Sequence, residues 1–334
     1  MATATTYARP MVARWVRRGL WHPYELACRR LPLVPFQVDV SEPVAGVRVI
    51  RIGNVVTRLI TRIGGGYDYS VSYLVGDRLL VDTGFAWARR PLGRALHDLG
   101  VDKTLTHVVN THAHEDHIGN NDLIAEISDA QILLHPAAVA SVRWPAQRPW
   151  YRGFMFGPLT GSRVAAIGDG LDAGPYRFDV VDTPGHTPDH LCLHEPERGW
   201  LFAGDLYVDE RLDAQLSDVD GPSWITSLDR AIALAPTALF DGHGLVVQGR
   251  GQVRTALEAK REFLVSVRDR VHREAPHAQT LPQLTQRVFA GNGLADRLSQ
   301  REGRLSLLTR SDFSRSHLVA TFQQAASVGE RLEP

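Results

Sequence analysis

The chain has 334 residues, of which 44% are hydrophobic and 22% charged, as in globular proteins and unlike disordered chains. The 37 Lys and Arg balance the 37 Asp and Glu. A formal net charge of zero excludes a protein that is basic throughout, as many nucleic-acid-binding proteins are.

Cysteine usage and hydropathy bear on the compartment. Two cysteines are too few for a disulfide framework and favour a reducing environment. The sequence contains no apolar run long enough to cross a bilayer. The first 30 residues lack the continuous apolar segment of a signal peptide. We therefore expect a cytoplasmic protein without a transmembrane segment.

Residues 1–45 are interpreted as an N-terminal helical arm that docks on the body of the protein. Residues 1–35 carry six Arg against one acid, together with Trp15 and Trp21. A homodimer in which the arm covers the neighbouring subunit is one interpretation of this segment, and binding to a membrane surface is another.

From residue 46 the pattern changes to short apolar segments typical of β-strands. Strands are expected within residues 47–53, 55–63, 70–84, 105–112, 131–135, 176–185, 190–205 and 237–247. Gly76-Asp77 is the dipeptide signal of a tight hairpin turn. Helices are expected at 88–100, 120–128, 136–143 and 223–236. Two strand-rich halves, each followed by helices, predict an α+β domain over 46–250, with two sheets packed face to face and helices outside.

Residues 251–334 are predicted to be a helical extension, beginning with a long amphipathic helix at 252–275. Residues 252–334 hold thirteen Lys and Arg against nine Asp and Glu. This excess of four positive charges is weak electrostatic support for RNA as a partner. A structural cap is the favoured interpretation.

The segment NTHAHEDHIGNN, residues 110–121, follows a short buried strand and concentrates metal-ligand side chains. Imidazole and carboxylate are the nitrogen and oxygen donors of zinc and other first-row metals. A spacing of two places His112 and His114 on one side of an extended segment, while Asp116 and His117 point toward a second ion. One loop can therefore supply ligands to two adjacent metals.

Three further donors occur in matching positions. His186, Asp205 and His243 each come directly after a predicted strand and beside a glycine, at 185, 204 and 242. Glycine lets the backbone turn sharply, and loops at strand ends are where a rigid scaffold positions reactive groups. Several such motifs in this order favour a metal site over isolated surface histidines.

H-x-H-x-D-H at 112–117, followed by His186, Asp205 and His243, is similar to the motif set of the metallo-β-lactamase superfamily. The resemblance covers about residues 45 to 250 and implies a four-layer αββα sandwich with a two-metal site at one edge. Because Asp116 and Asp205 are retained, the chain looks like the glyoxalase II, lactonase and β-lactamase-like protein 2 branches and unlike a true β-lactamase. The C-terminal extension resembles the small helical extension, sometimes winged-helix-like, of the β-lactamase-like protein 2 branch. Some members of that branch cleave single-stranded RNA.

The resemblance also implies roles for single residues. His112, His114 and His186 would hold one ion; Asp116, His117 and His243 would hold the other; and Asp205 would bridge the two. Asp82, at the end of a strand, would support the metal loop without binding metal. His190 is interpreted as structural. Two Zn²⁺ per chain are expected, and iron or manganese would fit the same donors.

The predicted activity is hydrolysis of an ester, thioester or lactone by a hydroxide that bridges the two ions. Asp116 is the predicted catalytic residue. As a metal ligand beside the hydroxide, its carboxylate can orient that nucleophile and then pass a proton to the leaving group. The expected partner is a small-molecule substrate. A pocket over the metals is predicted from the aromatic side chains of Trp150, Tyr151, Phe154 and Tyr207. The alternative for the aromatic side chains of residues 144–158 is that they pack an inserted helical hairpin.

Two alternatives use the same metal core. A phosphodiesterase or ribonuclease would show steep salt dependence of substrate binding. An iron-dependent sulfur dioxygenase would hold one iron and consume O₂. A binding scaffold without activity is the least favoured interpretation, because the full ligand set is present.

Overall fold

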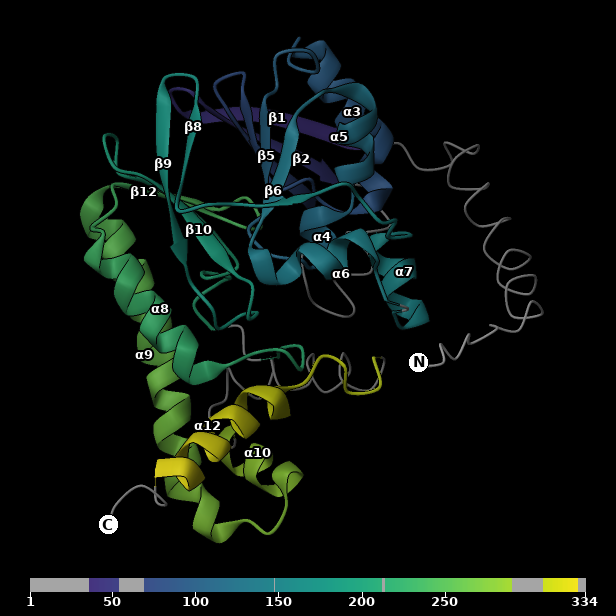
Figure 1. The fold of residues 1–334 in the computed structure, drawn as a ribbon. Helices are drawn as coiled ribbons and strands as arrows, with labels where there is room; N and C mark the ends of the chain where they lie inside the picture. The colour runs from purple at the N-terminus through teal and green to yellow at the C-terminus, as the bar shows by residue number, and fades with distance from the viewer. Residues whose placement is uncertain (1–35, 54–68, 147, 212–213, 290–308, 330–334) are drawn as a thin grey trace, which may run out of the picture.

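Two β-sheets pack face to face, and helices cover both outer faces (Figure 1). The computed structural model describes residues 36–53, 69–146, 148–211, 214–289 and 309–329. The predicted α+β class and αββα layers are confirmed, and helices follow at the C-terminal end. The predicted strand at 55–63 and most of the N-terminal arm lie outside the described residues.

In the described part of the chain, the first sheet has seven strands, and they follow one another in sequence order. They are β1 (Gln37–Val44), β2 (Val47–Gly53), β3 (Tyr69–Val75), β4 (Leu79–Val81), β5 (His107–Val109), β6 (Gln131–Leu134) and β7 (Ala165–Ala166). The first four pair antiparallel, and the predicted hairpin between β3 and β4 is present, with Gly76 at φ +58°. From β4 to β7 the strands pair parallel, with helices in the crossovers.

The second sheet has six strands in the order β13-β12-β11-β10-β9-β8. They are β8 (Gly170–Ala173), β9 (Tyr176–Asp182), β10 (Leu191–Glu195), β11 (Trp200–Gly204), β12 (Ala238–Asp241) and β13 (Val246–Gln248). Its only parallel pair among the described residues is β11 with β12. The helix α8 (Gly221–Ala233) makes that crossover.

The core between the sheets follows from the two-residue period of the strands. In β10, Leu191 and Leu193 face the other sheet, whereas Cys192 faces the helices. Phe202 and Phe240 stack with ring centroids 4.6 Å apart, and Tyr73 from the first sheet meets both rings edge-on. Aromatic pairs in these geometries add to the free energy of burial and fix how the sheets face each other.

Short helices cover the outer face of the first sheet. They are α3 (Arg89–Asp98), α4 (Glu115–Ile118), α5 (Asn121–Ile127), α6 (Val139–Arg143) and α7 (Trp150–Phe156), with 3₁₀ turns η1 (Ala86–Ala88) and η2 (Pro136–Ala138). The predicted helices at 88–100, 120–128 and 136–143 are confirmed. Leu92 and Leu96 of α3 pack on Ile50 and Ile52 of β2.

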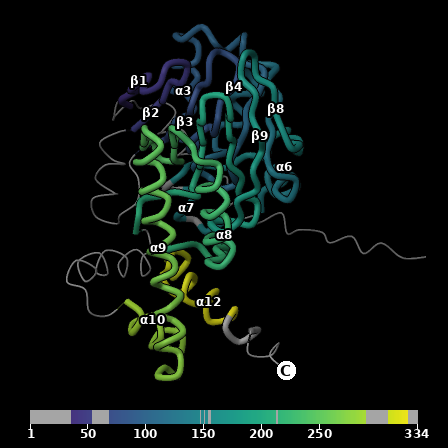
Figure 2. The backbone as a smooth tube through the Cα atoms, turned by 90° about the vertical axis from the view of Figure 1, so that its left-hand side faces the viewer, coloured from purple at the N-terminus to yellow at the C-terminus, as the bar shows by residue number. Residues whose placement is uncertain are grey.

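The long helix α9 (Arg250–Glu274) joins the second sheet to the C-terminal helices (Figure 2). The C-terminal helices are α10 (Leu281–Phe289) and α12 (Arg315–Gly329), with the 3₁₀ turn η3 (Ala275–His277) between α9 and α10. Val253 and Leu257 of α9 share one buried cluster with Leu239 of β12 and Phe322 of α12. The division at residue 250 thus falls at the start of a helix whose core is common to both parts.

Strand β1 lies within the range assigned to the N-terminal arm. It pairs antiparallel with β2 from Gln37 to Val44, so the first sheet begins before residue 46. The strand is hard to recognise in the sequence because its alternation is short: Val38 and Val40 alternate with polar residues only as far as Ser41. Glu42 and Pro43 then interrupt the pattern, and a proline within such a run is typical of an edge strand or of no strand.

The structure contains no described helix that is both long and apolar enough to cross a bilayer. α9 is the longest described helix, and one of its buried residues is Lys260, whose Nζ donates to the carbonyl oxygen of Val208 at 3.3 Å. The ammonium group also lies 4.9 Å from the centre of the Trp224 ring, a cation–π contact that helps to offset its burial.

Phe322→Ala is expected to destabilise the sandwich together with the C-terminal helices. The Phe322 ring is fully buried and lies against Gly221, the first residue of α8. Its loss should lower the free energy of unfolding by about 3–5 kcal/mol, because the cavity cannot close fully. Urea unfolding followed by tryptophan fluorescence and by helical circular dichroism measures this, with the exposed Gln323→Ala as control. Melting of the helices alone, with the fluorescence midpoint unchanged, would contradict the shared core.

Candidate metal centre

All seven predicted metal ligands lie in one cluster at an edge of the sandwich. The His112–His117 segment follows β5, His186 follows β9, Asp205 follows β11 and His243 follows β12. Three overlapping groups have ligand atoms within 4.8 Å of one another: His112, His114 and His186; His112, His117 and Asp205; and Asp116, His117 and His243. The first and third groups coincide with the two predicted ligand triads.

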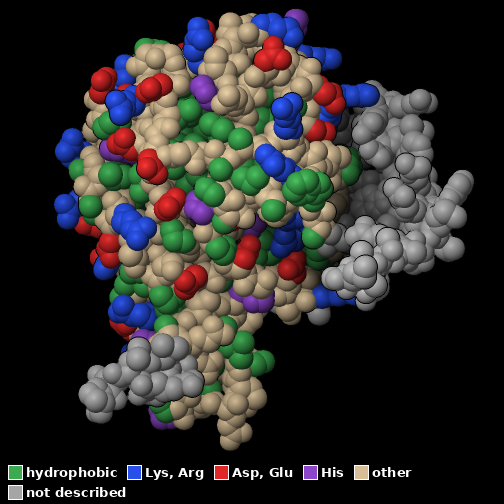
Figure 3. Space-filling view, viewed as in Figure 1, with side chains coloured by type: hydrophobic (Ala, Val, Ile, Leu, Met, Phe, Trp, Pro, Cys, Tyr) green, Lys and Arg blue, Asp and Glu red, His purple; other side chains and the backbone are tan. Residues whose placement is uncertain are grey.

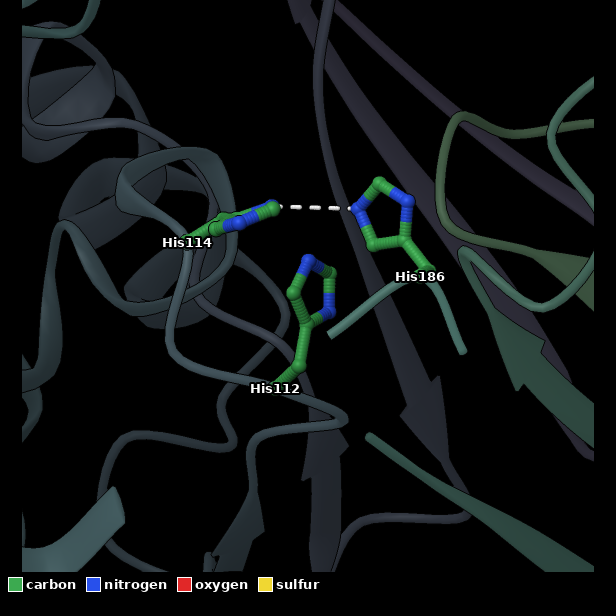
Figure 4. Close-up of side chains that lie close together, drawn as sticks. All are labelled: His112, His114 and His186. Carbon is green, nitrogen blue, oxygen red and sulfur yellow. Dashed lines mark hydrogen bonds between the residues drawn. The ribbon is translucent and has the colours of Figure 1, made fainter. Parts of the chain in front are cut away.

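Three imidazole rings converge in the first triad (Figure 4). The His114 Nδ1 and His186 Nε2 atoms are 3.1 Å apart. His112 lies between them and is fully buried. Three ring nitrogens thus face a common point.

Asp205 lies between the two triads. Its Oδ2 is 3.3 Å from His186 Nε2 of the first triad and 3.3 Å from His243 Nε2 of the other. Its Oδ1 is 3.4 Å from His117 Nε2. One carboxylate therefore contacts imidazoles of both triads, the arrangement that a bridging ligand requires.

The donor set fits divalent metal ions. Metal–donor bonds of about 2.0–2.1 Å in a tetrahedron place neighbouring donors about 3.3–3.4 Å apart, and the separations of 3.1–3.4 Å above are close to this. Among the described residues, His112 Nε2, His117 Nε2 and Asp205 Oδ1 are buried and have no hydrogen-bond partner. Each buried polar atom without a partner lowers the free energy of unfolding by about 1–3 kcal/mol, and a bound cation would provide a partner for all three. The cluster is thus a candidate metal-binding site.

Burial keeps part of the cluster neutral. It lowers the pKa of His186 to about 4 and that of His112 well below the ordinary value. Neighbouring histidines lower the His112 pKa further. Neutral imidazole is the form that binds metals, because protonation removes the lone pair.

In the second triad, nearby carboxylates raise the pKa of two histidines. Burial lowers the pKa of His117, but Asp82, Asp205 and Asp116 outweigh it and raise this pKa well above its ordinary value. The pKa of His243 is raised as well, because Asp205 outweighs burial. This half of the site therefore favours positive charge, which a metal ion supplies.

Asp82 supports the metal loop through hydrogen bonds to His117 and Thr111. Its Oδ2 accepts from His117 Nδ1 at 2.8 Å, and its Oδ1 accepts from the backbone N–H of Thr111 at 2.8 Å. These bonds leave His117 Nε2 directed at Asp205 and fix the ring tautomer. Asp82 has φ +59°, a conformation that Asp tolerates better than most residues.

His190 supports Asp205. Its Nδ1 lies 2.8 Å from Thr183 Oγ1, and its Nε2 accepts from the backbone N–H of Asp205 at 3.0 Å. Burial lowers the pKa of His190 to about 3, so the ring is neutral. Both nitrogens are thus engaged in holding the loop, in agreement with the predicted structural role.

Two residues that support the ligands are not among the predicted site residues. Asp218 accepts from His114 Nε2 at 3.3 Å, and the pKa of Asp218 is about 2, because this bond and the histidine charges outweigh burial. Arg51 of β2 donates to the carbonyl oxygen of Gly244 beside His243. Neither residue lies in a recognisable motif, and both are distant in sequence from the residues that they hold.

The glycines beside the ligands have two distinct roles. Gly204 has φ +46°, so the turn before Asp205 requires the left-handed conformation, as predicted. Gly242 has no positive φ, but a Cβ there would collide with the Asp205 carboxylate and with the His117 ring. At this second position the absent side chain makes room for the ligands.

The predicted substrate-pocket residues are only partly described. Tyr151 is 9% exposed, and its hydroxyl donates to Asp312. Tyr207 is 7% exposed and lies in the buried cluster with Trp224. The side chains of Trp150 and Phe154 lie outside the described part of the structure. A pocket formed by these four residues stays a prediction.

Gly242→Ala is expected to lower metal content without unfolding the chain. The added methyl group would push the Asp205 carboxylate away from His117. Elemental mass spectrometry of purified protein measures the number of bound ions. The control is Gly251→Ala in α9, where a Cβ meets nothing within 4 Å. Equal metal content in both variants would contradict the placement of Asp205 among the ligands.

Asp82→Asn is expected to weaken metal binding about 10–100-fold, the usual cost of losing a partner that orients a ligand. The amide tolerates the same backbone conformation, but it carries no charge to orient the His117 ring. Competition with a chelator measures the affinity. Asp77→Asn, at an exposed turn, is the control, and equal affinity in the two variants would refute the role of Asp82.

Comparison with known proteins agrees with this geometry. A family model described as the metallo-beta-lactamase superfamily matches residues 65–243. Hydroxyacylglutathione hydrolase from Erythrobacter litoralis is 34% identical over 142 residues, covering 42% of this chain and 49% of the relative. Acyl-coenzyme A thioesterase MBLAC2 from Gallus gallus is 28% identical over 146 residues, covering 40% of this chain and 53% of the relative.

The match with solved structures extends further along the chain. A beta-lactamase domain protein from Burkholderia ambifaria superposes with a TM-score of 0.60 at 18% identity, covering 86% of this chain and 88% of that one, which shows the fold. The chain spans about half the length of the curated relatives it matches. The family model covers more than half of this chain and ends at His243. The chain therefore belongs to the metallo-beta-lactamase superfamily.

Proposed function

We propose that this chain is a hydrolase that uses two metal ions to cleave a thioester, and that both ions are zinc. One observation carries the proposal: two triads of nitrogen and oxygen donors that share the Asp205 carboxylate. His112, His114 and His186 would hold one ion, and Asp116, His117 and His243 the other. Divalent ions held there would bring the pKa of a water near neutrality and polarise a carbonyl oxygen.

Asp116 is the proposed catalytic residue because it is the most accessible of the ligands. Its side chain is 23% exposed, against 1% for His117 and 11% for His114. Its carboxylate lies 3.9 Å from His117 Nε2. A carboxylate at the open side of the cluster can hold a proton and deliver it to a departing sulfur.

The neighbouring acid is unsuited to that role. Glu115 is 4% exposed, and its carboxylate is held by Arg148 at 2.7 Å and by Arg152 at 3.3 Å. A buried carboxylate that two guanidinium groups already hold is not available to a substrate. Of the two adjacent acids, only Asp116 is open to solvent.

The relatives favour thioesters within the wider class of esters, thioesters and lactones. Two kinds of curated relative have names that specify a thioester: hydroxyacylglutathione hydrolase and acyl-coenzyme A thioesterase. Both are similar to less than half of this chain, so the acyl and thiol parts of the substrate belong to the proposal. A small-molecule thioester in the cytoplasm agrees with the predicted reducing compartment.

The surface charge supports a small substrate over RNA. On the face shown in Figure 3, Lys and Arg side chains are interspersed with Asp and Glu. Four of the basic side chains on α9 form ion pairs: Arg254 with Glu258, Arg261 with Asp229, Arg268 with Asp269 and Arg273 with Glu274. Pairing reduces the field that would attract a phosphate backbone.

The wild-type protein is expected to contain about two zinc ions and to hydrolyse thioesters. Elemental mass spectrometry gives the stoichiometry. A panel with a hydroxyacylglutathione, an acyl-coenzyme A, a lactone and a chromogenic phosphodiester gives the specificity, with released thiol detected by a disulfide reagent. We expect kcat/KM for one thioester to exceed that for the phosphodiester by at least about tenfold. Removal of metal by a chelator should abolish the activity, and added Zn²⁺ should restore it.

Two results would contradict this function. Turnover of the phosphodiester alone, with steep salt dependence, would indicate a nuclease. One iron per chain with oxygen consumption on a persulfide substrate would indicate sulfur oxidation. Asp205→Asn, which removes the bridging charge, is the inactive control for every substrate.

A further inference from the structure

A short turn before α12, residues 309–314, is connected to the metal centre through two sets of intermediate residues. The turn connects to α12, which packs on α8, α9 and α10. Asp312 contacts α7, and Ser314 pairs with the loop that precedes α8. The C-terminal helices therefore contribute a segment to the surroundings of the ligands, beyond covering the sandwich.

The first route runs through Asp312. Its Oδ2 accepts from Arg152 Nε at 2.9 Å and from the hydroxyl of Tyr151. Arg152 is 9% exposed, and its Nη1 donates to both oxygens of the Glu115 carboxylate at 3.3 Å. Glu115 is the residue between His114 and Asp116. One buried guanidinium thus links the turn to the metal loop.

The second route runs through Ser314. Its N–H donates to the Gln215 carbonyl oxygen at 2.9 Å, and the Gln215 N–H donates back at 3.2 Å. Three residues after Gln215, Asp218 accepts from His114 Nε2 at 3.3 Å. A two-way backbone pair holds the loop whose carboxylate orients a ligand.

The turn itself has an unfavourable backbone. Arg310 and Ser311 have φ of +53° and +65°, two successive non-glycine residues in the left-handed region. The N–H of Asp312 closes the turn on the Thr309 carbonyl oxygen at 3.2 Å. Such conformations persist only where surrounding contacts fix them. Here the contacts include those of Asp312 and Ser314 and the bond from His317 Nε2 to the Ser311 carbonyl oxygen at 2.8 Å.

We propose that the 309–314 turn is part of the metal centre and that Asp312 is a positioning residue for His114. Both routes end at His114, one through the adjacent Glu115 and the other through Asp218. His114 donates Nε2–H to Asp218 and offers Nδ1 toward His186, so the orientation of its ring decides whether the first triad closes. The inference rests on the proposed metal site and assigns a role in it to a residue of the C-terminal extension.

The test measures metal binding without substrate. Asp312→Ala should weaken the binding of one Zn²⁺ about 10–100-fold, as loss of an orienting partner does, and should leave the other ion's affinity unchanged. Titration with Zn²⁺ against a chelator gives both affinities. Titration with Co²⁺ alone adds a spectrum, because its visible absorption changes when a ligand leaves. Asp312→Glu keeps the carboxylate and should recover most of the affinity.

The matched control is Asp229→Asn. Asp229 also pairs with an arginine, Arg261, but on the exposed side of α8 and α9. Wild-type affinity for both ions in Asp312→Ala, with only reduced resistance to urea, would overturn the proposal and leave the turn a structural element.

Asp218→Asn keeps the proposal testable if Asp312→Ala does not fold. This variant leaves the turn intact and removes the charge that accepts from His114. It should weaken the same ion, and unchanged affinity would overturn the route through Ser314. A wild-type chain that binds two ions but cleaves no thioester would refute the proposed function and leave this inference standing.

Discussion

The structure depends on holding seven nitrogen and oxygen ligands a few ångströms apart in a cluster that is buried except on the side of Asp116. Five of the donor pairs lie 3.1–3.9 Å apart, and three buried atoms of the cluster have no hydrogen-bond partner. Lone pairs that face each other at this distance repel, and burial removes the water that would screen them. The surrounding fold has to supply the restraint, and a bound cation would convert the repulsion into attraction.

Strand direction provides much of that restraint. β4 and β5 are parallel in the first sheet, and β11 and β12 are parallel in the second. β9 runs in the same direction as β11, because both pair antiparallel with β10. Loops that follow parallel strands emerge at the same edge of a sheet, so ligands from distant parts of the sequence meet there. Rigid strands also hold side chains more accurately than long loops do.

The sequence was sufficient for the features that are local. The ligand residues stand in short motifs directly after apolar strands, and the hairpin at Gly76 has its own dipeptide signal. Strand β1 is poorly marked because its alternation of Val38 and Val40 with polar residues is interrupted at Glu42 and Pro43. Asp218 and Arg51 were missed for another reason. Each acts on a residue more than a hundred positions away, His114 and Gly244, and no local pattern marks such a partner.

Glu115 and Asp116 are adjacent carboxylates with different surroundings. Both begin the short helix α4, where consecutive side chains point about 100° apart. Glu115 turns toward two arginines and is buried, whereas Asp116 turns toward the ligand cluster and keeps 23% of its side chain exposed. One of those arginines, Arg152, is itself held by Asp312, 160 positions along the chain. Which acid is free for chemistry is therefore decided by contacts far from the motif, since the motif places the two carboxylates but leaves their partners to the rest of the fold.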